Sequence, residues 1–68
     1  MDIKLTLKAA RINAGVSLET AAKAISRSVS AIRRYERQTS VPSVVDAQIL
    51  ADLYKIPVSN LTFVRKSN

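Results

Sequence analysis

The chain has 68 residues, of which 11 are Lys or Arg and five are Asp or Glu, and it contains neither His nor Cys. A chain of this length forms at most one small domain. The missing residue types exclude disulfides, Cys- or His-ligated metals and imidazole acid–base catalysis. We therefore expect no enzyme, no metal and no cofactor. The formal net charge of +6 indicates a polyanionic partner, either nucleic acid or an acidic surface.

The apolar content of 47% is that of a globular chain. No apolar run reaches the ~18 residues that a membrane-spanning helix needs. The first residues also lack the apolar stretch of a secretory signal. We therefore expect a cytoplasmic protein with no membrane partner.

Apolar residues recur at helical spacing in five short segments. Gly15, the single glycine, follows the first segment, where a left-handed C-terminal cap is needed. Serines at the starts of the later segments are suited to cap them: Ser17, Ser28, Ser43 and Ser59. The predicted helices span residues 5–14, 17–25, 28–37, 43–54 and 59–64, and residues 65–68 are expected to fray. The pattern predicts one all-α domain with short connections.

The second and third predicted helices are separated by only Ser26 and Arg27. A connection this short is typical of a helix-turn-helix, in which the second helix of the pair enters the major groove of DNA. The segment from Lys23 to Arg37 has five basic residues and one acidic residue, so it carries +4 of the chain's +6. Because phosphate contacts dominate DNA affinity, this concentration of charge indicates a DNA-binding surface.

Several short motifs surround this segment in a fixed order: Asn13–Ser17, Ala21–Ala22, Ser28–Arg37, Pro42–Ser43 and Leu50–Val58. Together they resemble the Cro and phage-repressor (XRE-type) family over residues 5–63. The resemblance implies a five-helix, lambda-repressor-like domain with its helix-turn-helix at residues 17–37. It also implies a small Cro-like or modulator protein of a temperate phage's lysogeny switch. Such a protein binds double-stranded operator DNA in the bacterial host cell and often forms a homodimer.

The same resemblance assigns roles to individual positions. The residues expected to read bases are Val29, Ser30 and Arg34. The residues expected to contact the DNA backbone are Lys23, Arg27, Ser28, Arg33 and Arg37. Three departures from the family pattern accompany this assignment. Leu18 stands where many relatives use Gln to bind a phosphate, Val29 is limited to apolar contacts, and Ser26–Arg27 replaces a Gly and an apolar residue in the turn.

These departures favour a second hypothesis, in which the partner is a protein. Leu18, Val29 and Arg33 would then form an apolar surface with a basic rim. The partner would be the phage's own repressor, and the protein would act as an antirepressor or modulator in a hetero-complex.

Other candidate residues have a structural interpretation as well. Arg33, Arg34 and Arg37 could be a solvated helix face, with Glu36 and Asp52 as salt-bridge partners. Tyr35 is in register with Ile32 and is expected in the core. The acidic residues Glu19 and Asp46 are interpreted as helix-start charges. The remaining apolar candidates either close the core or form an oligomer contact: Tyr54, Phe63 and Val64.

Overall fold

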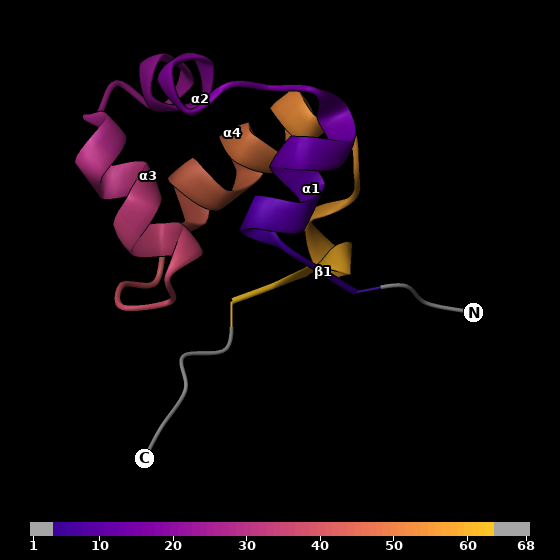
Figure 1. Ribbon diagram of the computed structural model, residues 1–68. Helices are drawn as coiled ribbons and strands as arrows, with labels where there is room; N and C mark the ends of the chain where they lie inside the picture. The colour runs from indigo at the N-terminus through magenta and orange to yellow at the C-terminus, as the bar shows by residue number, and fades with distance from the viewer. Residues whose placement is uncertain (1–3, 64–68) are drawn as a thin grey trace.

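The computed structural model describes residues 4–63, and within this range the chain is mainly helical (Figure 1). The α-helices are α1 (Leu7–Ala14), α2 (Leu18–Ala24), α3 (Val29–Glu36) and α4 (Val44–Tyr54). A short 3₁₀ helix, η1 (Val58–Asn60), follows α4. The strands β1 (Leu5–Thr6) and β2 (Leu61–Thr62) pair in parallel, with Leu5 opposite Leu61. No helix in this part of the chain is long and apolar enough to cross a membrane.

The expected count of five α-helices is wrong, because residues 4–63 form four. Of the segment expected to be a fifth helix, 59–64, the described residues instead form the end of η1 and then β2. Ser59 does not cap it, since η1 begins after Pro57 without a side-chain cap. The strand is stabilised by its pairing with β1, a contact between the two ends of the chain that helical spacing does not reveal. Val64 and the tail 65–68 lie outside the described residues.

The helix starts confirm the capping interpretation for the first three serines. The hydroxyl oxygens of Ser17, Ser28 and Ser43 accept hydrogen bonds from the N–H groups three residues later, at 3.0, 3.2 and 3.1 Å. Gly15 ends α1 at φ 71°, in the left-handed region. α1 begins at Leu7, because Thr6 accepts the cap bond from the Ala9 N–H. These local bonds fix where each helix begins and therefore how α2 and α3 are joined.

The core lies where α4 packs between the α2–α3 pair and α1 (Figure 1). Ile32 of α3 and Leu50 of α4 are each 1% exposed. Tyr54, at the end of α4, is also part of this core, and its burial raises the pKa of the phenol to about 12. Because Ile32 anchors one face of α3, the opposite face of that helix is turned to solvent.

Ser26, in the turn between α2 and α3, has φ 57° and so occupies the left-handed region without being glycine. Ser26→Gly is expected to stabilise the protein by about 1 kcal/mol, because glycine adopts this conformation without a Cβ clash. Thermal denaturation followed by circular dichroism should show a melting temperature about 5 °C higher. Ser26→Ala, which keeps the Cβ, should show no gain. A glycine variant that melts below the wild type would refute this explanation.

Candidate nucleic-acid interface

The α2–α3 pair has the connection of a helix-turn-helix. The Arg27 N–H donates to the Ala22 carbonyl at 2.9 Å and closes the turn, and Ser28 then caps α3. Ala31 and Ile32 bury one face of α3. The residues on its outer face, together with the C-cap residue Arg37, follow i, i+3, i+4 and i+7 spacing and are all exposed: Ser30, Arg33, Arg34 and Arg37. An exposed helix face of this kind is the part of a helix-turn-helix that can enter the major groove, which is wide enough for one helix.

The acids expected to neutralise this stripe are engaged elsewhere. Glu36 forms an ion pair with Arg11, and Asp52 accepts a hydrogen bond from Gln48 at 3.0 Å. Within residues 4–63, the ion pairs are Arg11–Glu36 and Arg27–Asp46. The arginines of the stripe therefore have no acidic partner in this range. Their charge is therefore available to a polyanion. If Glu36 and Asp52 formed salt bridges with this face, that charge would be neutralised.

The residues at the start of α3 differ in what they can offer DNA. Ser30 is exposed, whereas Val29 is half-buried and packs partly against the core. The Ser28 oxygen accepts the cap bond from Ala31, but its hydroxyl proton can still be donated to a phosphate. Lys23, at the last turn of α2, is exposed.

Arg27 is half-exposed, but it is not simply extended into solvent. Its Nε donates to Oδ2 of Asp46 at 2.7 Å. The Tyr35 hydroxyl donates to the same oxygen at 3.1 Å. Burial raises the pKa of Tyr35, and the hydrogen bond to Asp46 raises it further by a smaller amount. Asp46 lies in the first turn of α4, as its sequence position indicates. It is also buried, and it accepts the hydrogen bonds of both Arg27 and Tyr35.

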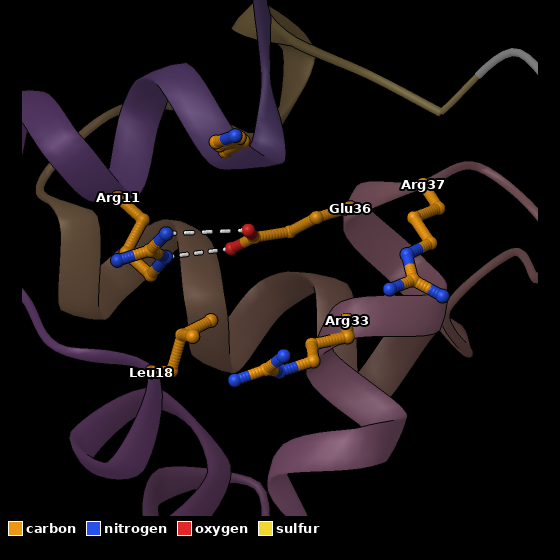
Figure 2. Close-up of a pocket in the computed structure, with 6 residues that line it drawn as sticks. Arg11, Leu18, Arg33, Glu36 and Arg37 are labelled. Atoms are coloured by element: carbon orange, nitrogen blue, oxygen red, sulfur yellow. Dashed lines mark hydrogen bonds and ion pairs between the residues drawn. The ribbon is translucent and has the colours of Figure 1, made fainter.

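A groove of about 300 Å³ lies beside the stripe, between α1, the start of α2 and α3 (Figure 2). Arg11 donates through Nε to Glu36 Oε2 at 2.6 Å, through Nη2 to Glu36 Oε1 at 3.3 Å, and through Nη1 to the Val16 carbonyl at 3.0 Å. This pair is largely buried, with side-chain exposures of 13% and 7%. The hydrogen bond to Glu36 raises the pKa of Arg11. The residues lining the groove are Lys8, Arg11, Leu18, Arg33, Glu36 and Arg37.

The structure brings Leu18 and Arg33 together in this groove, whereas Val29 does not line it. Sequence reasoning missed the Arg11–Glu36 pair. The sequence did contain one indication that Glu36 has a specific partner, since Glu36 is the single acid in the basic segment from Lys23 to Arg37. The Arg27–Asp46 pair was also missed, because a half-exposed arginine gives no sequence signal of an acidic partner 19 positions away.

The apolar candidates for an oligomer contact are placed differently from one another. Tyr54 is 3% exposed, so of its two interpretations the structure favours the core. Phe63 is half-buried and packs against the core. Three apolar side chains near the start of α4 are exposed: Val41, Val44 and Val45.

The fold and the exposed basic helix define a helix-turn-helix protein of the kind that binds DNA. The chain matches the family model of a helix-turn-helix domain over residues 5–62, and it belongs to this family of Cro/XRE-type domains. No curated protein and no solved structure matches the chain. The protein is thus placed in a class of DNA-binding regulators by its family and its fold.

Proposed function

We propose that this protein is a Cro-like transcription regulator that inserts α3 into the major groove of double-stranded operator DNA. The observation that carries the proposal is the exposed stripe of α3, whose arginines have no acidic partner within residues 4–63. Arg34 is suited to bond O6 and N7 of a guanine, Ser30 to bond either base of a pair, and Val29 to contact a thymine methyl. The stripe therefore supplies both charge and base-reading groups.

The backbone contacts in this proposal surround the base-reading groups. The residues that bind phosphates are Lys23, Arg27, Ser28, Arg33 and Arg37. They come from α2, the turn and α3, so they can hold the helix in a fixed register on the duplex. The resemblance to Cro and phage repressors supports a role in a phage lysogeny switch. It also supports a homodimer that reads two half-sites.

The proposal is tested by selecting a preferred duplex from a random-sequence pool and then titrating salt. Binding should weaken with a log–log slope of about −0.9 per phosphate neutralised. Arg34→Ala should cost about 1–3 kcal/mol and relax specificity at one base pair. Lys4→Ala, which removes the same charge near β1, should leave specificity unchanged. Failure of the wild type to retain any duplex at low salt would refute the proposal.

A second candidate function is an antirepressor or modulator that binds the phage repressor through the groove. The supporting observation is that Leu18 adjoins cationic Arg33 and Arg37 in one concavity. Arg11 and Glu36 satisfy each other there, so the uncompensated charge of the groove comes from Lys8, Arg33 and Arg37. Such a surface fits a protein segment with an acidic side chain beside an apolar one.

Two substitutions separate this candidate from DNA binding. Leu18→Lys should disrupt co-purification with the phage repressor, because it removes the apolar contact and crowds the groove. Arg34→Ala should leave that complex intact, because Arg34 does not line the groove. A complex that survives Leu18→Lys would count against the second candidate and leave the first unaffected.

A further inference from the structure

A buried carboxylate on α4 joins the two ends of α3. The side chain of Asp46 is 8% exposed. It accepts hydrogen bonds from Arg27, in the turn before α3, and from Tyr35, in the last turn of that helix. A charge is retained in such a place only when partners satisfy it. The Asp46 carboxylate therefore fixes both the turn and α3 relative to α4.

The bond to Asp46 uses only one of the donor atoms of Arg27. Nε makes the 2.7 Å contact, while the side chain as a whole is 51% exposed. A guanidinium has five N–H donors in a rigid planar fork, so both Nη groups remain for another acceptor. Holding Nε also restricts the orientations that the fork can adopt before any partner arrives.

The position of Arg27 suits a phosphate contact. It directly precedes Ser28, the cap of α3, and so lies at the N-terminal end of the helix, the end whose residues contact base edges in a helix-turn-helix. A long side chain that is already oriented loses less conformational entropy when it binds. The bond to Asp46 thus prepares Arg27 for the phosphate backbone at the rim of the groove.

We propose that Asp46 is a positioning residue for DNA binding, which holds Arg27 by Nε so that its Nη groups grip a backbone phosphate. This inference rests on the proposed function, because it assumes that α3 binds duplex DNA. It assigns to Asp46 a role in binding that differs from simple stabilisation of the fold.

Arg27→Lys is the most informative variant, because it keeps the charge. One ammonium group cannot reproduce the planar fork that bonds Asp46 and a phosphate together. Arg27→Lys should therefore reduce the salt slope by about 0.9 and weaken binding about fivefold near 0.15 M salt, as loss of one phosphate contact does. A lysine variant with the wild-type slope and affinity would overturn the inference.

Asp46→Asn gives an independent test, because the direction in which it changes DNA affinity distinguishes a positioning residue from a simple negative charge. Removing a negative charge near DNA should by itself strengthen binding, whereas loss of a positioning residue should weaken it. We expect Asp46→Asn to weaken binding and to reduce the salt slope toward that of Arg27→Lys. Combining Asp46→Asn with Arg27→Lys should cause no further loss of affinity. Tighter binding with an unchanged slope would overturn the inference.

Matched controls separate positioning from charge and from stability. Asp52→Asn removes the same charge from α4 at an exposed site that contacts Gln48, and it should not weaken binding. Tyr35→Phe removes the other bond to Asp46 but leaves Arg27 in place, so it should lower stability and keep the wild-type slope. If the wild type binds no duplex, the proposed function fails and this inference fails with it. If the wild type binds and Arg27→Lys behaves identically, only the inference fails.

Discussion

Glu36→Ala is expected to destabilise the protein by about 3 kcal/mol, a large share of the stability of a small domain. The loss follows from Arg11, which donates to both carboxylate oxygens of Glu36 and is itself 13% exposed. Without Glu36, the guanidinium keeps only the Val16 carbonyl as an acceptor and remains a largely buried, unpaired charge. The variant should be partly unfolded at 37 °C.

Urea denaturation followed by circular dichroism measures this effect. Asp52→Ala, on the exposed side of α4, is the control and should change the free energy of unfolding by less than about 0.5 kcal/mol. Arg11→Met combined with Glu36→Leu should recover most of the loss, because it removes both charges and keeps apolar volume. A Glu36→Ala variant as stable as the control would mean that the pair contributes nothing to folding.

Reversing the charge of two stripe residues should have the largest effect on binding. Arg33→Glu with Arg34→Glu is expected to weaken duplex binding at least about 100-fold, because both attractive contacts become repulsive. Folding should be preserved, since both side chains are exposed and form no ion pair within residues 4–63.

The matched control for charge reversal is Lys4→Glu with Lys55→Glu. It changes the net charge by the same amount at exposed residues that flank β1 and α4. Fluorescence anisotropy with a labelled duplex should show a much smaller loss of affinity for this control than for the α3 variant. Equal losses would mean that DNA senses only total charge and that α3 is not the contact surface.

The features that the sequence predicted are those set by neighbouring residues. Ser28 caps the helix that begins at the next residue, Gly15 ends the helix that precedes it, and Ile32 repeats the apolar spacing of the third helix. Each of these depends on a few adjacent positions, so periodicity and capping rules detect them. The helix-turn-helix follows from the same rules, since only a short turn separates two capped helices.

The features that the sequence did not reveal depend on distant partners. Glu36 pairs with Arg11 across 25 positions, and Asp46 with Arg27 across 19. The strand pairing of Leu5 with Leu61 joins the two ends of the domain and replaces the expected fifth helix. No local sequence pattern indicates which charged residues form an ion pair across such separations. The exposed stripe of α3 could be predicted, whereas the freedom of its arginines from acidic partners required the fold.

The central claim, that α3 enters the major groove, is tested most directly by NMR with isotopically labelled protein and the selected duplex. Addition of DNA should shift the backbone amide signals of Val29, Ser30 and Arg34 most strongly, together with Ser28 at the start of the helix. Signals of Lys4 and Lys55 should stay nearly unchanged. Shifts centred on Lys8 and Leu18, with those of Ser30 and Arg34 unmoved, would contradict the claim.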